Sequence, residues 1–168
     1  MTSAVVDACL IINWSLFSEP DRIKRAFNRL LMPEVTFEEI KSERAKALSA
    51  KWLSERYLVL TPVIDEGEVS KILSLIAIYP QVPIIDPPEL YAFVLAKRLR
   101  IPLLTDNKAP KRLTEVVPEY KEVAVYDSLD ILIMTSPREE LNDVIERFMN
   151  ETSFRFSRRR LKSLGYTR

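Results

Sequence analysis

Short apolar runs alternate with longer amphipathic segments along this chain. The runs have the length and composition of buried strands, and they cover residues 3–9, 57–61, 101–105 and 122–126. The other segments have apolar residues at helical spacing; we expect helices over residues 10–16, 21–31, from 36 onward, 65–79, 87–99, 128–135 and 137–150. Strands that alternate with helices are typical of βαβ units. The sequence therefore predicts an α/β fold: a three-layer, doubly wound, mainly parallel sheet with helices on both faces.

The chain has 168 residues, which fits one domain with a buried core. We expect a single boundary, between a domain over residues 1–150 and a basic C-terminal segment over residues 151–168. Residues 155–168 carry six basic side chains and no acid, so the net charge of +1 leaves −5 on residues 1–154. An acidic body with a basic tail suits metal binding in one place and phosphate attraction in another. The alternative is a solvated tail without a partner.

The composition excludes several classes of site. There is no histidine, which removes Ser–His and Cys–His nucleophile pairs and histidine-bound zinc. The two glycines, Gly67 and Gly165, cannot form a P-loop or a GxGxxG turn. The single cysteine, Cys9, allows no internal disulfide, and no apolar run approaches the ~20 residues that span a bilayer. We therefore expect a cytoplasmic protein that does not insert in membranes, whose chemistry uses carboxylates, hydroxyls, lysines or hard cations.

Two acids follow predicted strands. Asp7 lies at the end of the first apolar run, and Asp106 directly follows the third. In an open parallel sheet, ligands bind beyond the carboxyl ends of the strands, so both side chains are expected at the same edge. Two carboxylates there repel each other and are stabilised by sharing a hard cation with oxygen ligands. The alternative is that each aspartate starts a turn or caps a helix.

Glu39 and Glu89 have adequate structural explanations of their own. Thr36 and Glu39 have the spacing of a capping box, in which the glutamate satisfies the start of a helix. Glu89 lies in the expected first turn of a helix, after Asp86 as candidate N-cap and two prolines, where acids favour the helix dipole. Spacing alone therefore indicates structural roles for both glutamates.

The order of motifs resembles the PIN-domain family, in particular an archaeal, VapC-like branch. The similar segments are VVDACLII, PEVTFEEI, ELYAFVLAKRLRIPLLTDN, EVAVYDSLDILI and SFRFSRRRLKSLG. They cover nearly the whole chain. In that alignment Glu39 corresponds to the family's glutamate, which lies three residues after a threonine. Glu89 corresponds to the third acid of the family's site. Asp106 follows Thr105, as the aspartate follows the threonine in the Thr-Asp pair of the family motif.

The resemblance implies a doubly wound domain that binds one or two divalent cations, Mg²⁺ or Mn²⁺, and cleaves RNA. The metal-binding and catalytic residues it implies are Asp7, Glu39, Glu89 and Asp106, with Cys9 and Asn107 in support. Many members are toxins silenced by an antitoxin protein, and many are homodimers. The chain departs from the family pattern at three positions: Cys9 replaces Ser or Thr, Asn107 replaces a further Asp, and Glu89 replaces the usual Asp. Asn107 adds no negative charge to a cation site.

Basic side chains near the acids are candidates for RNA contact. These are Lys97, Arg98, Lys108, Lys111 and Arg112, with Arg158 and Arg159 in the C-terminal segment. A solvated helix surface is the alternative for each. For Trp14 and Trp52, core packing is favoured over base stacking.

Two other functions compete with the metal-dependent ribonuclease. One is a catalytically silent PIN fold that binds RNA or protein, in which the acids serve only as caps. The other is a Mg²⁺-dependent phosphoryl-transfer or receiver-like domain. Because Asp7 has no adjacent acidic partner, we rank the receiver-like domain last.

Overall fold

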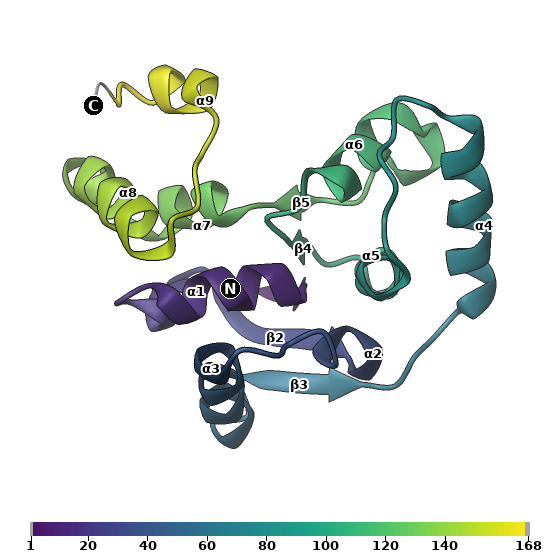
Figure 1. Cartoon of the computed structure of the whole chain (residues 1–168), viewed down its shortest axis with the longest axis horizontal. Helices are drawn as coiled ribbons and strands as arrows, with labels where there is room; N and C mark the ends of the chain where they lie inside the picture. The colour runs from purple at the N-terminus through teal and green to yellow at the C-terminus, as the bar shows by residue number, and fades with distance from the viewer. Residues whose placement is uncertain (1, 167–168) are drawn as a thin grey trace.

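A computed structural model describes residues 2–166 of the chain (Figure 1). Over these residues a five-stranded, all-parallel sheet has the order β3-β2-β1-β4-β5. The strands are β1 (Thr2–Val6), β2 (Phe27–Pro33), β3 (Leu58–Thr61), β4 (Leu103–Leu104) and β5 (Val125–Tyr126). Helices cover both faces, so the predicted α/β, doubly wound, three-layer fold is confirmed.

Helices lie between the strands. They are α1 (Ala8–Leu16), α2 (Glu34–Phe37), α3 (Glu43–Ser54), α4 (Glu66–Ile78), α5 (Pro87–Leu99), α6 (Lys108–Val116), α7 (Ser128–Thr135), α8 (Arg138–Thr152) and α9 (Arg158–Ser163). Of these, α6, between β4 and β5, was not among the predicted helices. Two 3₁₀ segments, η1 (Pro20–Arg25) and η2 (Pro118–Tyr120), complete the described elements. None of the helices in residues 2–166 has the length and hydropathy that crossing a bilayer requires.

Each face of the sheet has its own hydrophobic core. Ala4 and Val6 of β1 belong to a cluster with residues of α1, α3, α7 and α8, whereas Val5 belongs to a second cluster with residues of α4, α5 and α6. This alternation follows from the strand, whose successive side chains point to opposite faces. Figure 1 shows the same division, with α1 and α3 on one side of the molecule and α4 and α5 on the other. As predicted, Trp14 and Trp52 are core residues, each fully buried.

The predicted helix over residues 21–31 is wrong. The chain forms η1 and then turns into β2, which lies between β1 and β3 in the sheet. Phe27, Leu30 and Met32 are buried there. A short apolar run fits a buried strand as well as one face of a helix, and only the pairing with β1 and β3 decides between them.

The long helix predicted to begin at Thr36 is also wrong. The chain forms the four-residue α2 and a turn, and α3 then begins after Ser42, whose side chain accepts a hydrogen bond from Ala45 N. Thr36 Oγ1 donates instead to the carbonyl oxygen of Pro88 at 2.7 Å. The capping box with Glu39 does not form, because Thr36 lies inside α2 rather than at its N-cap, and Glu39 N donates to the Thr36 carbonyl oxygen at 3.1 Å.

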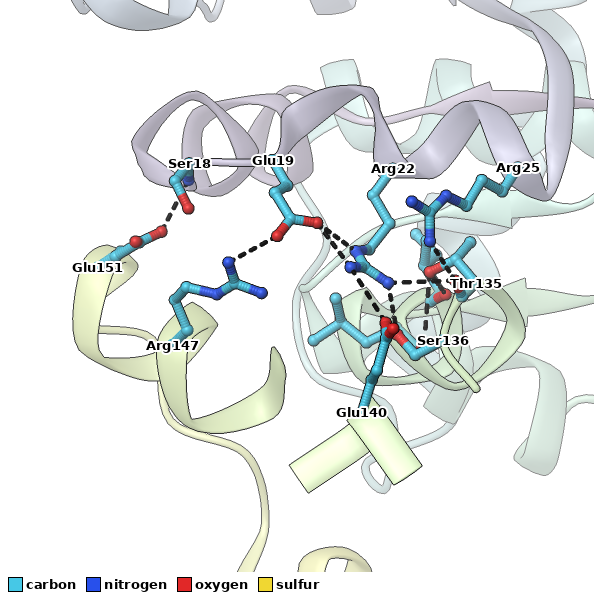
Figure 2. A network of polar contacts seen from close by, with 11 residues as sticks. Ser18, Glu19, Arg22, Arg25, Thr135, Ser136, Glu140, Arg147 and Glu151 are labelled. Carbon is cyan, nitrogen blue, oxygen red and sulfur yellow. Dashed lines mark hydrogen bonds and ion pairs between the residues drawn. The ribbon is translucent and has the colours of Figure 1, made fainter. Parts of the chain in front are cut away.

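A buried arginine connects η1 to the end of α7 (Figure 2). Arg22 donates to the carbonyl oxygen of Thr135 at 3.2 Å and to Ser136 Oγ at 3.0 Å, and its Nε donates to Glu19 at 2.8 Å. Arg25 donates to the same Thr135 carbonyl. The last carbonyls of a helix lack partners within the helix, so these arginines satisfy the C-terminal end of α7.

The C-terminal segment is packed on the domain body as far as the structure describes it. Phe156, Leu161 and Tyr166 are buried members of the first core cluster. Arg160 pairs with Asp127 and also with Asp130, at 2.7 Å. The basic segment predicted from residue 151 onward therefore contributes to the core through residue 166, while Arg168 lies outside the described residues.

Candidate active site

The order of strands reverses next to Asp7 and Asp106. From β1 the chain proceeds outward through β2 and β3, and β4 and β5 lie on the other side of β1. Val6 pairs with Leu104, so the residues that follow β1 and β4 leave the sheet at the same edge. This is the topological switch point, where open α/β sheets bind their ligands. The strand topology alone therefore brings Asp7 and Asp106 to one edge.

Neutral donors surround the carboxylate of Asp7. Its Oδ1 accepts from Ala8 N at 2.8 Å, and its Oδ2 accepts from Thr105 Oγ1 at 3.0 Å and from Cys9 Sγ at 3.3 Å. The residue is 3% exposed. Burial raises the pKa of Asp7 above its ordinary value despite these hydrogen bonds, and the charge of Glu39 raises it further.

Asp106 has a similar environment, built by helices α1 and α7. Its Oδ1 accepts from Ser128 N at 2.8 Å, and its Oδ2 accepts from Ser128 Oγ at 2.6 Å and from Asn13 Nδ2 at 2.8 Å. Ser128 Oγ in turn accepts from the indole of Trp14 at 2.9 Å. Burial raises the pKa of Asp106, with a contribution from the charge of Asp127. No described lysine or arginine pairs with the carboxylate of Asp7 or Asp106.

Glu89 lies in the first turn of α5 and is held by Asn107. Asn107 Nδ2 is 2.7 Å from Oε1 and 2.8 Å from Oε2 of Glu89, and Asn107 Oδ1 accepts from Ala109 N as the N-cap of α6. Burial raises the pKa of Glu89, and the charges of Asp7 and Asp86 add to this effect. Asn107 therefore orients a neighbouring glutamate and caps a helix.

Glu39 lies on an exposed turn after α2. Its charge acts on Asp7, but no hydrogen bond or ion pair ties its side chain to the other acids within residues 2–166. In the same range, no three or more Cys, Asp or Glu side chains stand together as a group that could hold a metal ion. Asp7 and Asp106 therefore share one edge of the sheet, and Glu39 and Glu89 interact with Asp7 through their charges, but no three of the four acids stand together within residues 2–166.

A cleft of about 500 Å³ opens beside Asp106. Thr105, Asp106 and Asn107 line it from the end of β4, and residues of the C-terminal segment line it as well. The predicted RNA contacts Lys108, Lys111 and Arg112 line this cleft, and so do Arg155 and Arg160 of the basic C-terminal segment.

The remaining predicted RNA contacts do not line the cleft. Arg158 and Arg159 are exposed on α9. Lys97 pairs with Glu68 at 2.6 Å, and Arg98 pairs with Asp65 at 3.1 Å.

Sequence reasoning missed Asn13 and Ser128, which hold Asp106. Asn13 is a polar residue within the largely apolar run 10–16, and Ser128 directly follows a strand and an aspartate. A polar side chain inside an otherwise apolar helix is a usable signal, because a buried polar group needs a hydrogen-bond partner.

The donors at the edge fit a hard divalent cation. Carboxylate oxygens are the ligands that Mg²⁺ and Mn²⁺ prefer, and Mg²⁺ commonly binds through one or two carboxylates while it keeps several waters. Asp7 and Asp106 are carboxylates that only neutral groups contact, so a cation would offset their charge.

No family model matches this sequence, and no curated protein or solved structure is significantly similar to it. The resemblance to PIN domains stays a prediction, carried by the motifs and by the arrangement of these acids.

Proposed function

We propose that this protein is a Mg²⁺- or Mn²⁺-dependent endoribonuclease of the PIN type, which hydrolyses phosphodiesters of single-stranded RNA. One observation carries the proposal: Asp7 and Asp106 follow paired central strands at the topological switch point, and each partly or fully buried carboxylate is contacted only by neutral donors. Such anions cost folding free energy, which is a recurrent property of functional sites.

The surrounding side chains orient the carboxylates of the site. Thr105 and Cys9 fix the carboxylate of Asp7, Ser128 and Asn13 fix that of Asp106, and Asn107 fixes Glu89. Asp7, Asp106 and Glu89 would hold the cation, with Glu39 at the exposed side. When bound, a divalent cation activates water and offsets the charge that develops on the phosphate. The chemistry then needs no histidine, in agreement with the composition.

The basic cleft beside Asp106 supports RNA as the substrate, since Lys108, Lys111 and Arg112 face the same space as the acid. From the resemblance we further propose a cytoplasmic, homodimeric protein, which acts as a toxin with a cognate antitoxin protein.

A catalytically silent, RNA-binding PIN scaffold is the second candidate. It is favoured by the absence of a preassembled group of three metal ligands over residues 2–166, and by the exposed position of Glu39. In that case the neutral donors around the aspartates serve stability alone.

Cleavage of RNA distinguishes the two candidates. Purified protein is incubated with end-labelled single-stranded RNA and Mn²⁺, with and without EDTA, beside Asp7→Asn and the control Asp143→Asn, an exposed aspartate of α8. The nuclease predicts cleavage that EDTA and Asp7→Asn abolish and that Asp143→Asn preserves. Intact RNA that is nevertheless bound by the wild type supports the scaffold.

A further inference from the structure

The cleft beside Asp106 has an aromatic side and a cationic side. The C-terminal segment provides Phe154, Arg155 and Phe156, whereas α6 provides Lys108 and Lys111. We propose that this cleft holds one nucleotide of the RNA strand, with its unpaired base against Phe154 and its phosphate at Lys108 and Lys111. The identification of the nucleotide as part of a substrate rests on the proposed function, whereas the capacity to bind it does not.

The aromatic side is a supported surface. Phe154 is half-buried, and its ring meets that of Phe156 edge-on at 5.6 Å between centroids. Phe156 is buried and stacks on Phe148 of α8, also at 5.6 Å. Phe154 therefore packs against the core and also lines the cleft. Val125 lines the cleft as well. A preordered ring of this kind suits a nucleobase, because every base has a face that stacks on aromatic side chains.

On the cationic side, Lys108 and Lys111 form no ion pairs with described residues of the protein. Both lysines are exposed. Of the other cations of the cleft, Arg112 pairs with Glu115 and Arg160 pairs with Asp127 and Asp130. Arg155 donates to the carbonyl oxygens of Met149 and Phe154 instead.

The placement of these lysines opposes the dipole of α6. Lys108 begins this helix, Lys111 lies one turn further, and the first turn holds no acid. Basic groups at the positive end of a helix are unfavourable unless an anion lies nearby. A phosphate in the cleft would offset both lysines and the helix end.

The dimensions favour a single strand over a duplex. The volume of about 500 Å³ lies in the range of pockets that enclose one small organic molecule. A paired base is stacked within its duplex and cannot enter such a space, whereas the unstacked base of a single strand can be turned out into it. Since Asp106 lines the same cleft, the bound nucleotide would neighbour the phosphodiester that is cut.

The test uses mononucleotides with the full-length protein. Binding of 5′-AMP, 5′-UMP, adenosine and ribose 5-phosphate is measured by calorimetry in EDTA, where no divalent cation contributes. We expect both nucleotides to bind. Adenosine and ribose 5-phosphate should each bind at least about tenfold more weakly than the nucleotides, because each lacks one of the two contacts. Raising the salt concentration should weaken binding of the nucleotides but not of adenosine.

Variants assign the two contacts. Phe154→Leu should weaken nucleotide binding about tenfold, and Phe154→Trp should retain it, because tryptophan restores the stacking face that leucine lacks. Lys108→Ala combined with Lys111→Ala should weaken nucleotide binding and flatten its salt dependence. The controls are Met134→Leu, an exposed apolar residue of α7, and Lys121→Ala combined with Lys162→Ala, two exposed lysines outside the cleft. Thermal denaturation identifies any variant that is unfolded.

The results separate this inference from the nuclease proposal. Nucleotides that fail to bind, or that bind equally well to Phe154→Leu and the wild type, overturn the inference. Ribose 5-phosphate that binds as tightly as AMP leaves only an anion site and overturns the assignment of the base. If AMP binds as described but RNA is not cut with Mn²⁺, the nucleotide cleft stands and the nuclease proposal alone fails.

Discussion

Replacing Asp7 with asparagine should stabilise the folded protein at neutral pH. The carboxylate is 3% exposed and accepts hydrogen bonds from Ala8 N, Cys9 and Thr105. Hydrogen bonds to a charged group contribute about 1.5–3 kcal/mol each, whereas removing a carboxylate from water costs several kcal/mol. Burial raises the pKa of Asp7 in spite of the three donors, so desolvation is the larger effect.

Asparagine removes the charge at little cost in hydrogen bonds. Its Oδ1 can still accept from Ala8 N, and its amide can donate to Thr105 Oγ1, which also neighbours Cys9 Sγ at 3.3 Å and can donate there. We expect the free energy of unfolding to rise by about 1–2 kcal/mol at pH 7. For a chain of this size that corresponds to an increase in Tm of about 2–8 °C.

The gain should depend on pH with a definite sign. Well below pH 3.8, the ordinary pKa of aspartate, Asp7 is neutral in the folded and the unfolded chain, and the variant has no advantage. As the pH rises through the interval between 3.8 and the raised pKa of the folded state, the unfolded chain releases its proton first. The wild type therefore loses stability relative to Asp7→Asn across that interval, and the difference is complete above it.

Urea denaturation at a series of pH values, followed by circular dichroism, measures this difference directly. Asp143→Asn, at an exposed position of α8, is the matched control and should change the unfolding free energy by less than about 0.5 kcal/mol. The reasoning is refuted if Asp7→Asn is less stable than the wild type at pH 7, or if its gain is the same at pH 4 and pH 7.

Three further substitutions test the contacts around the site and the core. Arg22→Ala should lower the unfolding free energy by about 2–4 kcal/mol, because the buried guanidinium and its hydrogen bonds to Glu19, the Thr135 carbonyl and Ser136 are lost; a loss under 1 kcal/mol in urea denaturation would contradict this. Asn107→Asp should lower the unfolding free energy of the metal-free protein, since it places a carboxylate against Glu89, and should strengthen Mn²⁺ binding in calorimetry. An unchanged unfolding free energy together with unchanged Mn²⁺ binding would show that residues 107 and 89 are not in contact. Arg160→Ala should lower the unfolding free energy by about 1 kcal/mol, because Asp130 at the start of α7 loses its partner, and Arg160→Lys should recover part of it; equal denaturation midpoints for all three proteins would count against the pairing.

Elements with a one-sided apolar pattern and clear end signals could be predicted from the sequence. Helix α5 begins after Asp86 with two prolines, and α7 follows a strand and an aspartate; both have the predicted bounds, residues 87–99 and 128–135. Strand β2 could not be predicted, because its run of apolar residues also suits one face of a helix. Its structure is decided by pairing with strands that are distant in sequence.

The same division holds for the site. The rule that parallel strands end at one edge was sufficient to place Asp7 and Asp106 together. The partners of Asp106 depend on where α1 and α7 pack, so Asn13 and Ser128 were not predicted. The aromatic side of the cleft depends on the docking of the C-terminal segment, which no local pattern encodes.

Binding of Mn²⁺ tests most directly whether Asp7 and Asp106 share a cation. Free Mn²⁺ is measured by its electron paramagnetic resonance signal during titration of the wild type, Asp7→Asn, Asp106→Asn and Asp143→Asn. Saturable binding by the wild type and Asp143→Asn, weakened at least about tenfold in each of the other two variants, is the expected result. A wild type that leaves the free Mn²⁺ signal unchanged, or strand-end variants that bind as tightly as the wild type, would contradict it.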